Sequence, residues 1–165
     1  MEVAEQLRSV GLKAHGSFTW GDPVHAIPQC SGIYIVSMRA HVTEWPGNET
    51  ANELTKMERE LEESLWTPSE AVVYIGQTTR SLRTRIRDMF RHDYVKGGNH
   101  DGEKSVHLLR YEIGLTVHWA CDDNPGWSEA RMLLLFLKRY GRLPYANREL
   151  PRREHLRLAK DGSAE

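Results

Sequence analysis

Two stretches decide the fold, SGIYIVS at 31–37 and AVVYI at 71–75. Both are short, apolar and rich in β-branched or aromatic residues, and turn-forming or helix-breaking residues bound them. Each therefore predicts a buried strand. Both strands carry a tyrosine beside a glycine, because Gly32-Ile33-Tyr34 lies in the first and Tyr74-Ile75-Gly76 ends the second.

Outward from these strands the pattern changes to helical spacing. We expect helices over 2–10, 49–65, 82–92, 126–140 and 149–159, further strands over 106–111 and 115–120, and a loop over 15–29. Ser81 and Asn124 are placed to cap two of these helices. The order of strands and helices predicts one small α/β (α+β) domain over 1–165. Within it, 48–66 is a helical insertion between the two glycine–tyrosine strands and 148–165 is a basic C-terminal tail.

The composition limits the class of protein. The chain has 165 residues, of which 39% are hydrophobic and 27% charged, enough apolar material for one core. It has no apolar run of about 18 residues and no secretory signal, so we expect no membrane partner. Cys30 and Cys121 form neither a disulfide framework nor a zinc cluster in this reading. We therefore expect a reducing, cytoplasmic location, with both thiols packed in the core.

The charge is distributed unevenly. Residues 1–79 hold 5 Lys and Arg against 11 Asp and Glu, whereas residues 80–165 hold 17 against 12. The basic half is richest in arginine at Arg80, Arg83, Arg85, Arg87 and Arg91. A local arginine field in a nearly neutral chain indicates a polyanion partner on one face, although a solvated helix face is the alternative.

The chain resembles the GIY-YIG nuclease superfamily over about 30–147. The residues that carry the resemblance are, in order, Gly32-Ile33-Tyr34, Tyr74-Ile75-Gly76, Leu82-x-x-Arg85, Glu129 and Pro144-x-x-Asn147. The resemblance implies a small three-stranded mixed or antiparallel sheet flanked by helices. It also implies a DNA endonuclease that depends on Mg²⁺ or Mn²⁺.

The resemblance assigns a role to each matching residue. Tyr34 would act as general base on the attacking water, and Tyr74 would position water or phosphate. Arg85 would stabilise charge on the phosphate, while Glu129 would hold the metal. Gly32 and Gly76 would let the backbone pass close to the site, and Asn147 would anchor the last turn. Arg80, Arg83, Arg87 and Arg91 would contact DNA, which we expect to be double-stranded.

The chain departs from the family pattern in three places. Met89 stands four residues after Arg85, where the family usually has histidine or tyrosine, and His92 is the candidate substitute. Glu129 stands 15 positions before Pro144, farther than in repair-type members of the family, and Asp122 and Asp123 are alternative carboxylates for its role. The insertion carries an apolar stripe (Leu54, Met57, Leu61 and Leu65) that we expect to pack on the domain, with a homodimer contact as the alternative.

The resulting functional hypothesis is a metal-dependent DNA endonuclease of a stand-alone restriction, mobile-element or phage type. A repair-type, structure-specific nuclease is one alternative. Another is a DNA-binding module of the same fold with weak or no turnover, which Met89 and the alternative carboxylates for Glu129 motivate. The third is an interaction subunit whose acidic insertion binds a partner.

Overall fold

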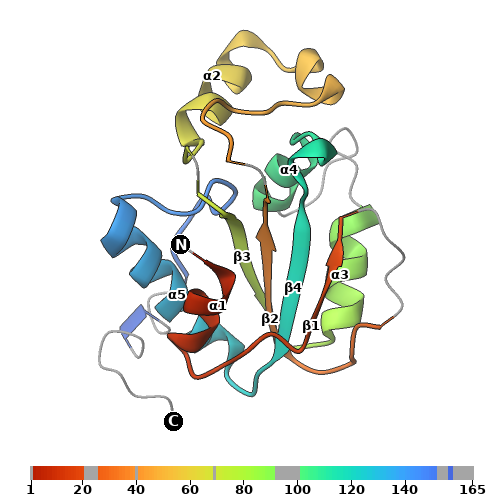
Figure 1. The fold of residues 1–165 in the computed structure, drawn as a ribbon, viewed down its shortest axis with the longest axis vertical. Coiled ribbons are helices and arrows are strands. Elements are labelled where there is room, and N and C mark those ends of the chain that lie inside the picture. Colours follow the sequence, from red (N-terminus) through yellow and green to blue (C-terminus); the bar gives the residue numbers. More distant parts are fainter. Residues whose placement is uncertain are drawn as a thin grey trace.

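The computed structural model describes residues 2–20, 26–39, 41–68, 70–91, 101–151 and 156–157, without the side chains of 91, 101–103 and 111. Within that part, four strands form one antiparallel sheet: β1 (Gly16–Thr19), β2 (Gly32–Ser37), β3 (Val72–Thr78) and β4 (Thr116–Cys121). Their order is β1-β4-β2-β3 (Figure 1). The predicted mixed α+β class is confirmed.

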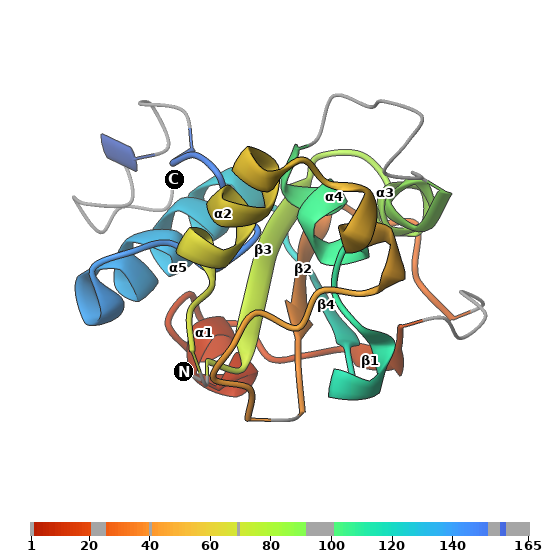
Figure 2. The same ribbon diagram turned by 90° about the horizontal axis from the view of Figure 1, so that it is seen from above.

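The sheet separates two hydrophobic layers. α1 (Val3–Arg8) and α5 (Pro125–Tyr140) cover one face, and α3 (Leu82–Arg91) and α4 (Asp101–His107) cover the other (Figure 2). β2 is buried along its whole length because it pairs on both sides and is covered on both faces. Alternate residues of β2 therefore enter different cores: Ile33 and Ile35 face α5, and Tyr34 and Val36 face α3.

The expectation of a three-stranded sheet is wrong, because the sheet contains a fourth strand, β1. β1 pairs with β4 inside the segment that the sequence assigned to a loop. Glycine and proline surround its four residues, and Gly16 looks like a breaker, but a Cβ there would lie 2.8 Å from Cη2 of Trp119. The glycine is what lets the strand pass over that ring.

The expected strand over 106–111 is also wrong. Val106 lies at the end of α4, and a 3-10 turn, η3 (Tyr111–Ile113), follows. Val106, Leu108 and Leu109 are nevertheless fully buried. A short buried helical segment has the same continuous apolar pattern as a buried strand, so periodicity alone cannot separate the two.

The helical insertion lies beyond the end of β2 (Figure 1) and consists of η1 (Glu49–Glu53) and α2 (Lys56–Leu65). Thr55 begins α2 with a reciprocal capping box to Glu58. The expected packing of the apolar stripe is wrong at its centre, since Met57 is 78% exposed and Leu61 is 54% exposed. Instead, α2 turns Glu62 inward, and this side chain is 6% exposed.

Glu62 faces inward because a polar network receives it, which we call the insertion cluster (Trp45, Glu62, Ser105, Tyr145 and Arg148). Tyr145 Oη donates to Glu62 Oε2 over 2.6 Å and Trp45 Nε1 donates to Tyr145 Oη over 2.8 Å. Arg148 pairs with Glu62 and also donates to Ser105. Arg148, the first residue of the expected basic tail, is thus held in this cluster. The rest of the expected tail helix lies largely outside the described residues.

The two cysteines overturn another expectation. Cys30 and Cys121 form a disulfide bond, with their Cα atoms 5.8 Å apart and a sequence separation of 91 positions. We expected two separate thiols in the core. The pairing arises because the antiparallel register places Gly32 opposite Cys121, which brings the start of β2 beside the end of β4. None of the helices described in the structure is long and apolar enough to cross a membrane.

Candidate active site

Tyr34 and Gly76 are cross-strand neighbours in the centre of the sheet. Tyr34 on β2 pairs in register with Gly76 on β3, and the tyrosine side chain is fully buried. A Cβ on Gly76 would clash with the Tyr34 ring and lie 2.6 Å from its hydroxyl oxygen. The tyrosine ring therefore occupies the space that a side chain at position 76 would need.

Tyr74 is the second aromatic group on this face. Its ring centroid lies 5.8 Å from that of Tyr34, and the two rings are tilted by 49°. A Cβ on Gly76 would also lie 2.8 Å from Cε1 of Tyr74. The spacing of two residues between Tyr74 and Gly76 places both on one face of β3, so the glycine makes room for a pair of phenols.

Arg85 reaches the tyrosine pair from α3. Ser81 caps this helix, since its Oγ accepts from the backbone N–H of Thr84 over 3.3 Å, as the sequence predicts. Leu82, Ile86 and Met89 anchor the helix on the sheet with fully buried side chains. Arg85, one turn into the helix, donates from Nε to Tyr34 Oη over 3.2 Å. Residues 51 positions apart are thus joined directly.

Glu129 comes from the second turn of α5 and completes the cluster. Burial raises the pKa of Glu129 to about 7, and the positive charge of nearby Arg85 opposes the shift. Within the described ranges we find no hydrogen-bond donor to its carboxylate. A desolvated carboxylate beside one arginine gains most from an additional cation or a proton. We call Tyr34, Tyr74, Arg85 and Glu129 the tyrosine cluster.

The two alternative carboxylates have different surroundings. Asp122 Oδ1 accepts from the backbone N–H of Asn124 over 3.0 Å, a local turn that leads into α5. Asp123 is exposed. Asp122 is thus engaged in the turn before α5, whereas Glu129 experiences the charge of Arg85.

Asn147 and Gly32 support the strands from outside. Asn147 accepts from the Ile75 N–H over 3.0 Å and donates to the Ile75 carbonyl over 2.8 Å, so it continues the ladder of β3 between Tyr74 and Gly76. A Cβ on Gly32 would clash with the Ala120 carbonyl and lie 2.8 Å from Cδ1 of Leu82. Gly32 thus lets β2 approach β4 and the start of α3 closely.

The remaining sequence candidates lie on or near α3. Arg80 and Arg87 are exposed, while Arg83 is half-buried and donates from Nε to the Ile27 carbonyl over 2.7 Å. Met89 is fully buried in the core and contributes no polar group. His92 and the side chain of Arg91 lie outside the described residues.

Two other features bear on where a ligand binds. Across the described ranges, no group of three or more His, Cys, Asp or Glu side chains is placed to hold a metal ion. Hollows of about 290 and 440 Å³ lie at the other end of the sheet, where both are lined by Ser37 and His118. They are separate from the tyrosine cluster, because Ser37 ends β2 whereas Tyr34 lies near its start.

Sequence reasoning missed the disulfide beside the cluster. The pattern of two cysteines 91 positions apart carries no pairing signal, because only the register of β2 with β4 brings them together.

Comparisons of the chain with protein-family models, with curated proteins and with solved structures give no match.

Proposed function

We propose that this protein is a divalent-metal-dependent DNA endonuclease of the GIY-YIG type. The observation that supports the proposal most is the hydrogen bond from Arg85 to Tyr34, with Glu129 within electrostatic reach of the same arginine. Three segments far apart in the sequence meet at this point. Phosphodiester hydrolysis needs a proton acceptor, a cation for the phosphate charge and a carboxylate for a metal, and these are the groups present.

Each side chain has a part in the proposed reaction. As the phenolate, Tyr34 Oη takes a proton from the attacking water, and the N–H of Arg85 stabilises the negative charge on that oxygen. The water oxygen then bonds to phosphorus while the bond to the leaving oxygen breaks, and solvent protonates the leaving group. The Arg85 guanidinium offsets the charge on the phosphate oxygens, and Tyr74 donates to a phosphate oxygen from the neighbouring strand.

Glu129 fits a hard cation such as Mg²⁺ or Mn²⁺. Its carboxylate is desolvated, and burial raises its pKa to about 7 although the charge of Arg85 opposes the shift. Mg²⁺ commonly keeps several waters and takes one or two protein carboxylates plus phosphate oxygens, so a single acidic ligand is compatible with it. When bound, the metal would polarise the phosphodiester and offset developing charge. Such a site should bind metal weakly without DNA.

Incubation of supercoiled plasmid with Mg²⁺ or Mn²⁺ tests the proposal. We expect nicked or linear product from the wild-type protein and at least 10³-fold slower cleavage by Arg85→Ala and Glu129→Gln. Arg139→Ala is the control, because Arg139 is an exposed arginine whose partner is Glu5 on α1. If the wild-type protein leaves the plasmid intact with both metals, or both variants cut at the wild-type rate, the proposal is wrong.

The position of Met89 favours a second candidate, a DNA-binding module of this fold without turnover. This buried side chain supplies no proton donor where the family usually has one. Duplex binding without cleavage in any divalent metal would favour this module. Cleavage by the wild-type protein that is lost in Tyr34→Phe would exclude it. A restriction, mobile-element or phage role is part of the main proposal, and a homodimer through the exposed apolar stripe of α2 is an alternative.

A further inference from the structure

The disulfide lies at the end of the sheet where the strands lead into both helices of the proposed site. Cys121 is the last residue of β4, and Cys30 lies two residues before the start of β2. Glu129 lies eight positions after Cys121, and Tyr34 lies four positions after Cys30. Neither cysteine is fully buried, so a small thiol can reach the bridge.

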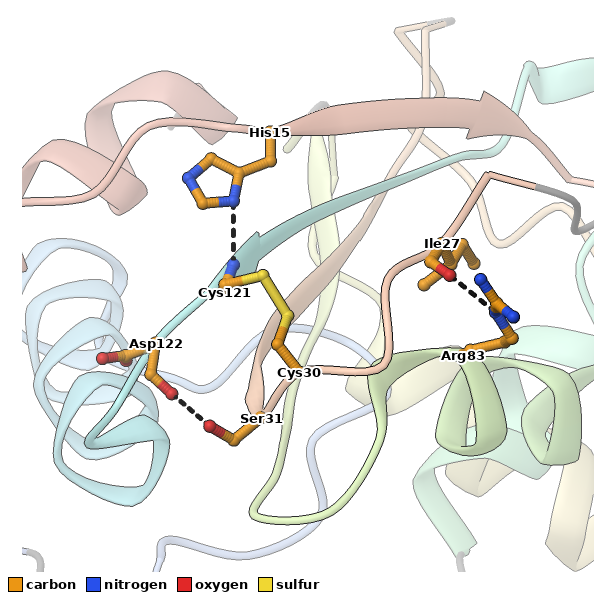
Figure 3. The surroundings of a disulfide bond; sticks show 7 residues. All are labelled: His15, Ile27, Cys30, Ser31, Arg83, Cys121 and Asp122. Carbon is orange, nitrogen blue, oxygen red and sulfur yellow. Dashed lines mark hydrogen bonds between the residues drawn. A yellow bond between two sulfur atoms is a disulfide. The ribbon is translucent and has the colours of Figure 1, made fainter.

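The segment before β2 holds the beginning of α3. The Leu82 N–H donates to the Cys30 carbonyl over 2.8 Å, and the Arg83 N–H donates to the Pro28 carbonyl over 3.2 Å. The Arg83 side chain adds a third bond, from Nε to the Ile27 carbonyl (Figure 3). The first-turn amides of the helix that carries Arg85 are therefore bound to the chain that leads directly into the bridge.

The other half of the bridge leads into α5. Ser31 Oγ donates to the Asp122 carbonyl over 2.7 Å (Figure 3), and the Asp122 N–H donates back to the Ser31 carbonyl over 3.1 Å. His15 Nδ1 accepts from the Cys121 N–H over 3.2 Å. Asp122 then forms the turn that starts the helix carrying Glu129. The disulfide is thus the covalent link between the attachment points of Arg85 and Glu129.

We propose that the Cys30–Cys121 disulfide is a redox-sensitive positioning element that keeps Arg85 and Glu129 in their working arrangement, so that the oxidised protein is the active form. The inference rests on the proposed function and concerns the regulation of that same site. A dithiol reductant would open the bridge reversibly. Its two thiols give up two electrons and two protons, the S–S bond breaks, two S–H bonds form on Cys30 and Cys121, and the reductant becomes a disulfide.

Reduction leaves hydrogen bonds as the remaining link between these attachment points. A bridge across 91 positions restrains the chain strongly, and its loss allows the starts of α3 and α5 to move independently. A displacement of about 1 Å of a charged group in a catalytic site commonly costs about 10²-fold in rate. DNA affinity should change much less, because Arg80 precedes α3, Arg87 lies on α3, and both are exposed at the surface rather than in the catalytic arrangement.

The test compares the oxidised protein, the same protein reduced with dithiothreitol, and the Cys30→Ser/Cys121→Ser double variant. The chain has only two cysteines, so dithiothreitol can act only on this bridge. We expect reduction to lower kcat for duplex cleavage at least tenfold while KM changes less than threefold. The double variant should have the same kcat as the reduced protein, and dithiothreitol should not change it. Equal kcat in the oxidised and reduced proteins would overturn the proposal.

Amide hydrogen exchange provides a readout that does not need cleavage. We expect faster exchange at 82–85 and 125–129 after reduction, and unchanged exchange in α2, which lies beyond the opposite end of the sheet. If no form cuts DNA, the proposed function fails, while faster exchange at both helix starts still supports the positioning role. Unchanged exchange there would overturn that role. So would unfolding of the whole reduced protein at the assay temperature, because the bridge would then be a general crosslink.

Discussion

Tyrosine, arginine and glutamate meet twice in this protein, at Tyr34, Arg85 and Glu129 and again at Tyr145, Arg148 and Glu62. In the insertion cluster the carboxylate of Glu62 accepts from Tyr145, from Ser105 and from Arg148. In the tyrosine cluster the arginine binds the phenol, and Glu129 receives only electrostatic attraction from it. The same three residue types therefore differ in hydrogen bonding, because protein donors bind the carboxylate of Glu62 but none is found for the carboxylate of Glu129 among the described residues.

This difference in hydrogen bonding indicates a structural role for the insertion cluster and a ligand-binding role for the tyrosine cluster. A buried carboxylate whose acceptor sites are filled by protein donors ties segments together, here α2, α4 and the chain after α5. The desolvated carboxylate of Glu129 costs stability and has capacity for a ligand. Burial, then Glu62, also raises the pKa of Tyr145, whose proton is held in the donated bond. The Tyr34 oxygen instead accepts from Arg85, the arrangement that stabilises a phenolate.

The largest expected effect is on Glu129. We predict that Glu129→Gln lowers the cleavage rate by about 10³-fold or more, since the amide keeps the shape but loses the negative charge that would hold the metal. Matched Glu62→Gln should cut DNA at a rate within threefold of wild type at a temperature where it stays folded. Plasmid cleavage at saturating Mn²⁺ compares the two. Equal losses in both variants would remove the distinction between the clusters.

The next effect separates the two tyrosines. Tyr34→Phe keeps the buried ring but removes the oxygen that accepts from Arg85, so we predict a loss of about 10²- to 10³-fold in kcat. Tyr145→Phe also removes one hydroxyl, but it should lower stability while leaving kcat within threefold of wild type. Single-turnover cleavage measures the loss of activity in both variants, and urea unfolding measures their loss of stability. The hypothesis of a proton acceptor is wrong if Tyr34→Phe retains full activity.

Opening the insertion cluster should cost stability. Arg148→Met leaves Glu62 without its ion-pair partner in a buried position, and we expect a loss of roughly 3 kcal/mol. The exposed Lys56–Glu60 pair on the same helix is the control, and Lys56→Met should change stability by less than about 0.5 kcal/mol. Urea denaturation at constant pH measures both. Similar values for the two variants would show that Arg148 does not stabilise the insertion.

The pH dependence of stability tests the state of Glu129. Because the folded-state pKa is raised to about 7 from 4.5, the folded protein binds this proton more tightly than the unfolded chain. The resulting stability is present below about pH 4.5 and is lost as the pH rises to about 7, by up to roughly 3 kcal/mol. Glu129→Gln should lack this slope and be more stable than wild type at pH 8. Urea unfolding of both proteins at four pH values measures this difference. If the free energies of unfolding of wild type and Glu129→Gln change with pH in parallel, Glu129 does not have the raised pKa.

The sequence predicted the elements that carry Tyr34, Tyr74 and Arg85 better than it predicted their surroundings. Two short apolar strands and a helix capped by Ser81 leave local patterns, and the resemblance to a family, not any local pattern, grouped Tyr34, Gly76 and Arg85. The bridge from Cys30 to Cys121, the inward turn of Glu62 and the strand β1 could not, because each depends on strand register or on partners from distant segments. Local propensity contains no information on such long-range partners.

The smallest expected effect concerns the arginines outside both clusters. Arg80 and Arg87 are exposed near or on α3, and we predict that Arg80→Ala/Arg87→Ala weakens duplex binding by about tenfold at moderate salt. The slope of log affinity against log salt should become shallower by about 2, one for each lost phosphate contact. Fluorescence anisotropy with a short duplex at several salt concentrations measures both values. Arg139→Ala is the charge-matched control on α5, and an equal change there would mean that binding follows net charge rather than the face that carries Arg85.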